Sequence, residues 1–465
     1  MMREGWKICK LGDVLLMKKD KHKPDSTENL FYIGLEHIEK GTGRLTEAVG
    51  IEEINAVKNT FKSGNILYGK LRPYLNKAHL ATQDGVCSTD ILVFEPSHQI
   101  DPKFALNFIL SRQFVNDMSE NTSGVNLPRV STKYVQNYQV PLPPLETQKA
   151  IVAKIEELFS ELDNGIANLQ EARRKIDIYR QSVLKKAFEG ELTKEWRSRQ
   201  PNLPTGEELL AQIQAERQRH YELQVAEWKS AVKTWEKNGT QGRKPGKPKK
   251  SDESQTVKEK ELKSLQQIPE EWCYGYLTSA GIMGRGKSKH RPRNDPMLYG
   301  GKYPFIQTGD VKAQDIVREY SQTYNDLGLS QSKLWPKGTL CITIAANIAE
   351  TSFLGIDACF PDSIVGFTPY HSIIDSKYIE YFFRSAKSRI SAFAPATAQK
   401  NINLNTLENL IVPLCSIQEQ TQIVQEIESR LSVCDKLTET IDNSLKQAEA
   451  MRQSILKKAF EGKLK

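Results

Sequence analysis

Apolar residues recur every seven positions along two stretches of the chain. The recurring positions hold Ile155, Leu162, Leu169, Ile176 and Val183 in the first stretch, and Ile427, Cys434, Ile441, Ala448 and Ile455 in the second. This period predicts a coiled-coil stripe on a long helix. The other seam position is poorer, with Gly165 and Ala172 in one helix and Arg430 and Ser444 in the other. We therefore expect the two helices to pair with each other, mainly through the Ile, Leu and Val residues of the two stripes.

Start and stop signals bound both helices. Pro143 and Pro144 precede the first helix, and Ser416-Ile417-Gln418-Glu419, typical of a capping box, opens the second. Gly190 and Gly462 follow the last turns. The first helix is expected from Leu145 to Glu189, which is about 68 Å at about 1.5 Å per residue. Such a length favours a spacer over the alternative, an ordinary amphipathic core helix.

The two helices belong to a tandem duplication. Residues 180–190 read RQSVLKKAFEG and residues 452–462 read RQSILKKAFEG, identical at ten of eleven positions at an offset of 272. The match extends upstream to Val140 and Val412, and a weaker landmark pairs Trp6 with Trp272. Each repeat is therefore a variable domain followed by a near-constant helix.

The variable domains are predicted to be mixed α/β. Residues 100–118 and 373–393 look helical, and ILYGKL, DILVFEP, TLCITIA and SIVGFTP look like strands. The fold class is thus α+β with pseudo-twofold symmetry. The expected divisions are a first variable domain at 1–140, a first helix at 141–192, an insertion at 193–267, a second variable domain at 268–411 and a second helix at 412–465.

The insertion between the repeats combines a helix with a basic tail. A capping box, Thr205-Gly206-Glu207-Glu208, precedes apolar positions that include Leu209, Ile213 and Trp228. Residues 239–254, GTQGRKPGKPKKSDES, predict a flexible linker. A solvated tether is the simpler interpretation of this linker, and contact with DNA is the alternative.

Composition narrows the function without deciding it. Sixty-five Lys and Arg against 57 Asp and Glu leave a net charge of +8, which favours a polyanionic partner. The N-terminal residues carry no signal-peptide pattern and no apolar run is long enough for a membrane span, so we expect a cytoplasmic protein. Seven scattered cysteines without a Cys-x-x-Cys pair indicate reduced, mostly buried thiols and no metal site.

One motif points to a nucleotide site, and its context argues against it. Residues 281–288 read GIMGRGKS and match the phosphate-binding loop pattern G-x-x-x-x-G-K-S. Such a loop must follow a buried strand and open a helix, but Pro292 and Pro296 follow too closely for a long helix. At the equivalent place the first repeat reads MKKDKHK, so the repeats share positive charge and not the motif.

Basic and amide side chains are the candidates for DNA contact. Cations suit phosphate contact, Arg suits guanine, and Asn or Gln suit adenine. A solvated loop, a core tyrosine or an ordinary turn is the alternative for each of them. The candidates in the first repeat are Lys18, Lys19, Lys21, Lys23, Lys70, Arg72, Tyr74, Lys77, Arg129 and Lys133. Those in the second are Arg285, Lys287, Lys289, Arg291, Arg293, Gln399, Lys400, Asn401 and Asn403.

Several of these stretches resemble a known family. VPLPPLETQKAIVAKIEELFSELD, RQSVLKKAFEGELTKEWR, GNILYGKLRPYLNKA and RQSILKKAFEGKL are similar to the specificity subunits of type I restriction-modification systems, over nearly the whole chain. The resemblance implies that each variable domain is a target-recognition domain for one half of a bipartite, asymmetric DNA site. It also implies that the two long helices pair antiparallel and set the gap between the two halves. The second repeat has GTLCITIAAN in place of GNILYGKLRP, so Lys70 and Arg72 have no counterpart there.

The resemblance also implies the partners. Two modification (methyltransferase) subunits, and two restriction/translocase subunits in the nuclease form, are expected to join this chain on double-stranded DNA. Adenine methylation, ATP hydrolysis and cleavage, with their S-adenosylmethionine, ATP and Mg, would belong to those subunits, so this chain is expected to be non-catalytic and to hold no cofactor or metal. Two other functions stay open: a nucleotide-binding protein that uses Gly281–Ser288, and a coiled-coil scaffold that does not bind DNA.

Overall fold

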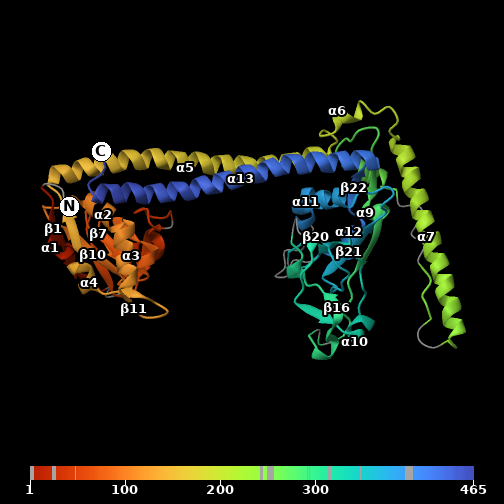
Figure 1. Cartoon of the computed structure of the whole chain (residues 1–465), viewed down its shortest axis with the longest axis horizontal. Coiled ribbons are helices and arrows are strands. Elements are labelled where there is room, and N and C mark those ends of the chain that lie inside the picture. Colours follow the sequence, from red (N-terminus) through yellow and green to blue (C-terminus); the bar gives the residue numbers. More distant parts are fainter. Residues whose placement is uncertain are drawn as a thin grey trace. The chain divides into compact units, whose positions relative to one another are not determined.

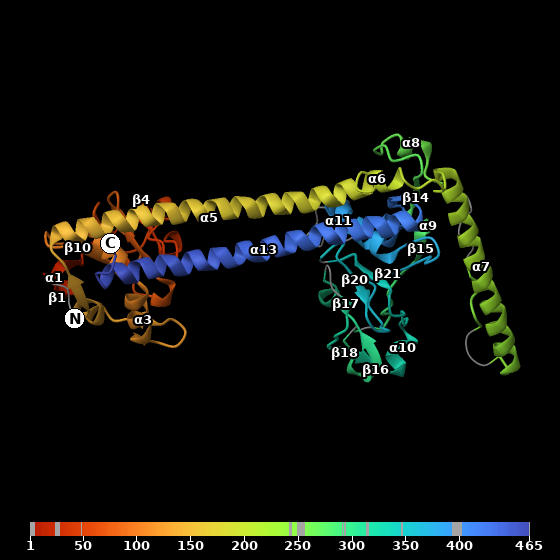
Figure 2. The same cartoon turned by 45° about the horizontal axis from the view of Figure 1, so that its top comes forward.

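The computed structural model describes residues 5–23, 28–47, 49–240, 244–248, 256–290, 292, 294–312, 316–345, 347–392 and 402–464. These residues form two compact units (Figures 1 and 2). The first unit contains residues up to Arg173 and those from Glu439 onward, and the second contains Arg174–Thr438. Two long helices, α5 (Leu145–Phe188) and α13 (Ile417–Phe460), contribute to both units.

The first unit holds the first variable domain. A four-stranded sheet has the order β2-β10-β7-β8, and a five-stranded sheet has the order β3-β6-β9-β4-β5. The strands of the first sheet are β2 (Leu15–Lys18), β7 (Ile66–Gly69), β8 (Ala78–Leu80) and β10 (Ile91–Pro96). Those of the second are β3 (Lys21–His22), β4 (Glu28–Ile33), β5 (Gly50–Ile54), β6 (Lys58–Phe61) and β9 (Gly85–Cys87). The helices are α1 (Leu11–Val14), α2 (Pro102–Ile109), α3 (Arg112–Glu120) and α4 (Thr132–Asn137), and β11 (Thr122–Ser123) pairs with β12 (Arg129–Val130).

The second unit holds the second variable domain and the insertion. Its main sheet has the order β15-β21-β19-β20-β17, and β16 (Tyr299–Phe305) pairs separately with β18 (Gln322–Tyr324). The main strands are β15 (Gly281–Arg285), β17 (Ile316–Val317), β19 (Leu340–Thr343), β20 (Thr351–Leu354) and β21 (Ile364–Pro369). The helices are α6 (Lys194–Arg197), α7 (Gly206–Lys237), α8 (Glu259–Leu262), α9 (Leu277–Ala280), α10 (Asp326–Ser330), α11 (Ser376–Ala392) and α12 (Leu404–Glu408).

Both variable domains are closed in the same way. In the first unit β1 (Lys7–Lys10) pairs antiparallel with β13 (Gln139–Leu142), directly before α5. In the second unit β14 (Cys273–Tyr276) pairs antiparallel with β22 (Ile411–Leu414), directly before α13. The start of each variable domain is therefore hydrogen-bonded to the segment that leads into its long helix.

The ends of the long helices are part of the domain cores. In the second unit Val183, Leu184, Ala187 and Phe188 of α5 and Ile423, Val424 and Ile427 of α13 are buried in one core cluster. In the first unit the residues 272 positions away, Ile455, Leu456, Ala459 and Phe460 of α13 and Ile151, Val152 and Ile155 of α5, take the same places in the core. The repeat in sequence is thus a repeat of packing.

Most local expectations are confirmed. Both long helices end at the phenylalanine before the stop signal, and Gly190 and Gly462 have φ of 76° and 67°, a conformation that favours glycine. All four expected strands form as β7, β10, β19 and β21. The cysteines are unpaired, and burial raises the pKa of Cys87 and Cys273 to about 12, which leaves their thiols protonated and unreactive.

One helix prediction is wrong in detail. The sequence predicts a single helix over residues 100–118, but the chain breaks between α2 and α3 at Ser111, whose backbone is extended (φ −68°, ψ 144°). The break lets the Phe108 ring contact the Phe114 ring at a centroid distance of 5.8 Å. The equivalent helix in the second domain, α11, is unbroken.

Because Ile155 and Ile427 occupy equivalent, nearly fully buried places, shortening either to Ala should lower the free energy of unfolding by about 2–5 kcal/mol. Ile178→Ala is the matched control, because Ile178 lies on α5 with 69% of its surface exposed, and it should cost less than about 0.5 kcal/mol. Urea unfolding followed by circular dichroism measures all three. Equal destabilisation at buried and exposed positions would contradict the described packing.

Candidate nucleic-acid interface

One ion pair between the long helices recurs in both units. In the first unit Arg452 of α13 pairs with Asp163 of α5. In the second unit Arg180 of α5 pairs with Asp435 of α13 at 2.7 Å. The two pairs are related by the offset of the duplication, since 180 + 272 = 452 and 163 + 272 = 435. The residue numbers of each pair sum to 615, so α5 and α13 run antiparallel in the same register in both units.

The seam residues lie around these pairs. Ile155, Val183, Ile427 and Ile441 are buried, whereas Leu162, Leu169, Ile176 and Ile455 are half-buried. Arg173 of α5 adds a further ion pair to Asp442 of α13, at 2.7 Å within the first unit. Its counterparts by the same offset are Leu445 and Gln170, so this pair has no repeat. The middle of the helices thus depends on ion pairs as well as on apolar contact.

Each variable domain is joined to its long helix by the same polar contacts. The Gln148 side chain accepts from the Asp101 backbone N–H at 2.8 Å and donates to two backbone carbonyls. Gln420 makes the equivalent contacts in the second unit, starting with Asp375 at 2.8 Å. Both glutamines are fully buried. These bonds satisfy buried backbone groups where the domain meets the helix.

A matching ion pair supports the same junction. Lys103 pairs with Glu156 at 2.6 Å in the first unit, and Lys377 pairs with Glu428 at 2.5 Å in the second. All four side chains are largely exposed, so each pair contributes little to stability. Their recurrence nevertheless shows that the domain and the helix are oriented alike in both repeats.

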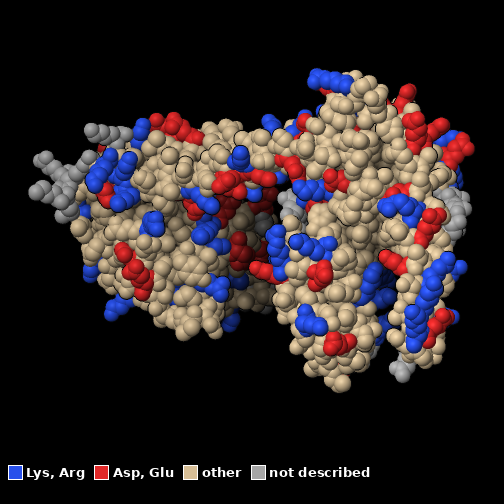
Figure 3. Space-filling model, turned by 45° about the vertical axis from the view of Figure 1, so that its right-hand side comes forward, with Lys and Arg blue, Asp and Glu red and all other residues tan. Residues whose placement is uncertain are grey.

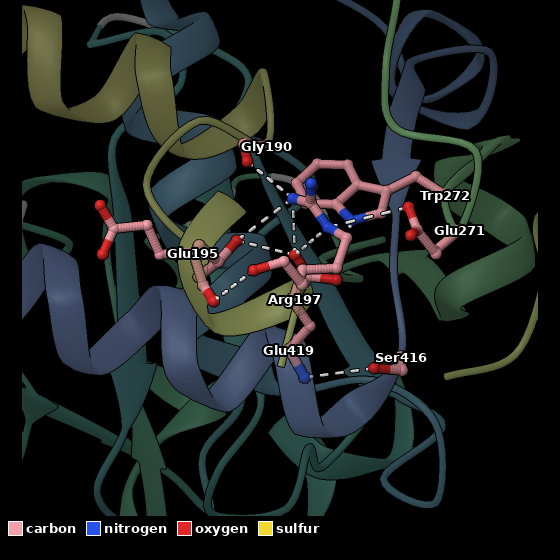
Figure 4. Close-up of polar contacts among 9 residues, drawn as sticks. Gly190, Glu195, Arg197, Glu271, Trp272, Ser416 and Glu419 are labelled. Carbon is pink, nitrogen blue, oxygen red and sulfur yellow. Dashed lines mark hydrogen bonds and ion pairs between the residues drawn. The ribbon is translucent and has the colours of Figure 1, made fainter. Parts of the chain in front are cut away.

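A buried carboxylate ties the insertion to the second long helix (Figure 4). Glu419 of α13 is 1% exposed, and its carboxylate accepts from Arg197 Nε at 2.9 Å, Thr193 Oγ1 at 2.7 Å and Trp272 Nε1 at 3.0 Å. Arg197 also donates to the Gly190 carbonyl at 2.6 Å. The sequence predicted a capping box here, and only its Ser416 half forms as expected, with the Glu419 N–H donating at 3.2 Å. The carboxylate instead neutralises the buried arginine. An unpaired buried charge would lower the stability of the fold far more than this buried pair does.

The basic side chains that follow β7 in the first domain, together with Arg129 of β12, are arranged around one carboxylate. Asp90 accepts from Arg129 Nε at 3.1 Å and Nη2 at 3.2 Å, and Lys70 lies 3.9 Å away. Arg72 has the left-handed φ of 50° and approaches the Asn126 carbonyl at 3.5 Å. Asp90, which the sequence did not single out, therefore holds Lys70 and Arg129 side by side at the surface beside Arg72.

The other first-domain candidates do not share one place. Tyr74 is half exposed. The Lys77 ammonium group donates to the Leu35 carbonyl, so it already has a partner within the domain. Lys18 pairs with Glu95 at 3.0 Å. Lys19, Lys21, Lys23 and Lys133 are exposed. Of these residues, Tyr74 lies closest in sequence to the group that Asp90 forms with Lys70, Arg72 and Arg129.

The phosphate-loop motif does not have the geometry of a phosphate loop. Residues 281–285 form strand β15, and no helix begins at Lys287 in the described residues that follow. A Cβ at Gly286 would come within 2.2 Å of the Phe360 carbonyl oxygen, so this glycine allows close chain packing. Arg285 donates to the Asp362 carbonyl at 2.8 and 2.6 Å. The nucleotide-binding alternative is therefore wrong.

The second domain nevertheless gathers cations next to this strand. Lys287 and Lys289 are exposed, and Lys333, which the sequence did not single out, lies with its Nζ 3.5 Å from the Trp335 ring centroid. Burial, and then the charge of Lys287, lower the pKa of Lys333. Asn403 caps α12 through the Thr406 N–H at 2.9 Å, as the turn interpretation expects. Arg291, Arg293, Gln399, Lys400 and Asn401 lie outside the described residues.

Sequence reasoning also missed a cationic cavity in the first unit. This cavity of about 660 Å³ lies among the first domain, α5 and α13. Its charged lining residues are Lys40, Arg44, Arg112, Lys446 and Arg452, with Asp163 and Glu449. Arg44 and Arg452 are both paired with Asp163. No local motif marks this lining, because its residues come from separate segments of the chain.

Both variable domains and most of both long helices match one known family. The model of the type I restriction modification DNA specificity domain covers residues 3–171 and 282–447, which is more than half of the chain. The chain belongs to this family. The insertion that holds α7 lies between the two matched stretches and outside both of them.

Curated relatives agree with this assignment. The chain is 34% identical over 219 residues to the type I restriction enzyme EcoDI specificity subunit of Escherichia coli, covering 46% of this chain and 49% of that protein. It is 24% identical over 355 residues to the EcoBI specificity subunit of Escherichia coli, covering 76% and 64%. The matched stretches therefore span about half to two thirds of those relatives.

Solved structures share the fold. A chain from a study of complex assembly and conformational transition of the type I R-M system matches with a TM-score of 0.70 and 18% identity, covering all of both chains. The HsdS subunit of Thermoanaerobacter tengcongensis matches with a TM-score of 0.55 and 20% identity, covering 100% of this chain and 98% of that one. Among the described residues, no helix is long and apolar enough to cross a membrane.

Double-mutant cycles should separate the two repeated ion pairs. Asp163 and Arg452 are 25% and 13% exposed, whereas Asp435 is 62% exposed. Replacing each pair by Ala, singly and together, should give a coupling of about 1–3 kcal/mol for Asp163 with Arg452 and less than about 1 kcal/mol for Arg180 with Asp435. Urea unfolding measures both couplings. Coupling near zero in the first unit would show that this pair does not help to hold the helices together.

Proposed function

We propose that this chain is the DNA specificity subunit of a type I restriction-modification complex and that it reads a bipartite, asymmetric site. The observation that carries the proposal is the contrast between constant and variable parts. The junctions made by Gln148 and Gln420 are equivalent, whereas the strand exits differ, with KLRP after β7 and IAAN after β19. Two domains held alike but carrying different side chains suit the reading of two different DNA words.

The proposed DNA contacts follow from cations that reach the surface of each variable domain. In the first domain Lys70, Arg72 and Arg129 would meet the duplex, since their side chains gather at one surface and Arg suits bidentate contact with guanine. In the second domain Lys287 and Lys289 would contact phosphates. Asp90 would position the cations of the first domain and would not itself contact DNA.

The proposed chemistry lies in the partner subunits. Two modification subunits, and two restriction subunits in the nuclease form, would bind this chain and supply S-adenosylmethionine, ATP and Mg for methylation, translocation and cleavage. The chain itself would contribute recognition and docking only, in the cytoplasm, where its DNA target lies. The names of the curated relatives, each a specificity subunit of a type I restriction enzyme, support this division.

Exchange of one domain tests the proposal. Replacing residues 1–140 by the equivalent domain of another specificity subunit should change one half of the methylated site and leave the other half as it was, because β13 and α5 stay in place. Sequencing of methylated adenines in cells that carry the hybrid measures both halves. A change in both halves contradicts separate reading, and a chain that assembles with its partners without binding DNA would be a scaffold.

We further propose that the long helices set the gap between the two DNA words. Four residues inserted after Glu171 in α5 and after Asn443 in α13, which face each other in the register of the pair, lengthen the helices by about 6 Å and rotate them by about 40°. The gap should grow by one or two base pairs, at about 3.4 Å each. Two-residue insertions at the same places rotate the helices by about 200° and should abolish recognition. Methylome sequencing that shows unshifted gaps in both variants would contradict this role.

A further inference from the structure

The insertion between the repeats carries a helix that is anchored at one end only. Helix α7 has 32 residues, but only Leu209 and Ile213, in its first turns, are buried. Its start adjoins the start of α13, because Glu208, Leu209 and Gln212 line one cavity together with Ser416, Ile417 and Gln418. From there α7 extends alongside the second variable domain (Figures 1 and 2).

The far half of α7 is braced by the chain that follows it. Trp228 donates from Nε1 to the Pro245 carbonyl at 3.0 Å, and Lys244 Nζ lies 5.8 Å from the Trp235 ring centroid. These contacts cover the half-buried side of the helix that holds Val225, Trp228 and Val232. A helix with no partner along its length would be marginal in water, so the bracing keeps the far end of α7 ordered.

The braced end is strongly basic. Lys229, Lys233 and Lys237 follow one another at four-residue spacing and so lie on one face of α7. Lys247 and Lys244 add two more charges, and Glu236 is the single carboxylate among the described residues from 228 to 248. All five lysines are exposed. In Figure 3, Lys and Arg side chains gather in the lower part of the right-hand column, with Asp and Glu side chains above them and at the lower end.

We propose that this basic end of α7 contacts the phosphates of double-stranded DNA next to the second half-site. Neighbouring lysines among these three are about 6 Å apart along the helix axis. Together they therefore span roughly four base pairs of a duplex at about 3.4 Å per base pair. Lysine acts as a point charge without a fixed fork of donors, which suits contact that ignores sequence. This inference rests on the proposed function, because the duplex must already be held by the second domain.

The place of α7 within the second unit defines which DNA it reaches. The helix stands at the Ile417 end of α13, and α13 runs away from it toward Thr438. The α13 helix is proposed to follow the gap between the two words, so α7 meets the duplex on the outer side of the second word.

The test replaces Lys229, Lys233, Lys237 and Lys247 by Gln in the full chain assembled with its modification subunits. Lys244 is kept because it braces Trp235. We expect about tenfold weaker binding to a duplex with long flanks near physiological salt, and a salt dependence flatter by about 0.9 for each phosphate that the variant no longer neutralises. The methylated sequence should be unchanged. Trimming the flank outside the second word should weaken the wild-type complex and not the variant, whereas trimming the other flank should affect both equally.

Matched controls make the outcomes distinct. The Lys→Arg variant at the same four positions keeps the charge and should bind as the wild type does. Gln at Lys260 and Lys263, two exposed lysines elsewhere in the insertion, should leave the salt dependence unchanged. An unchanged salt slope in the four-Gln variant overturns the inference while the proposed function stands. Loss of partner assembly with unchanged DNA binding also overturns it and points to a protein partner, and a wild-type complex that ignores DNA would refute the proposed function itself.

Discussion

The structure depends on the pairing of two long helices that have weak seams. Gly165 and Ala172 in α5 and Arg430 and Ser444 in α13 leave the alternate seam positions without large apolar side chains, so neither helix is expected to be stable alone. Pairing supplies what each lacks: the ion pairs of Asp163 with Arg452 and of Arg180 with Asp435, and core residues shared with a variable domain. Each unit is therefore built from helix segments that come from both repeats, and neither repeat is complete without the other.

This constraint explains where the sequence is constant and where it varies. The residues that join domain to helix, Gln148 with Asp101 and Gln420 with Asp375, cannot change without leaving buried polar groups unsatisfied. The segments that follow β7 and β19 are not part of these junctions, and there the two copies differ in sequence. A scaffold that is held fixed while its tips diverge is the physical basis for proposing that one chain reads two DNA words.

Much of the fold could be predicted because its signals are local. The seven-residue period, the prolines, Gly190 and Gly462 define the long helices, and the internal repeat shows that the architecture occurs twice. The break at Ser111 was missed, because no proline or glycine marks it in the sequence, although it lets the Phe108 and Phe114 rings come into contact. The capping box at Thr205 formed in full, with Glu208 accepting from the Thr205 N–H at 2.8 Å, whereas Glu419 was diverted to Arg197, which lies more than 200 residues away in sequence.

The candidate site was less predictable, because its side chains are brought together by contacts between segments that are far apart in the sequence. Lys70, Arg72 and Arg129 could be chosen by residue type, but Asp90, which holds two of them, is brought there only by tertiary folding. The phosphate-loop motif shows the reverse case, since a pattern of eight residues was satisfied by a strand and a close turn. Local patterns therefore predict the elements of this protein better than they predict the surface that would meet DNA.

The most direct test of the central claim is a map of methylated adenines across the genome of cells with and without this gene. We expect one asymmetric motif, made of two words separated by a fixed gap, to be methylated when the gene is present and unmethylated when it is removed, while all other methylated motifs persist. A methylome that stays the same after removal of the gene would contradict the claim that this chain selects a DNA target.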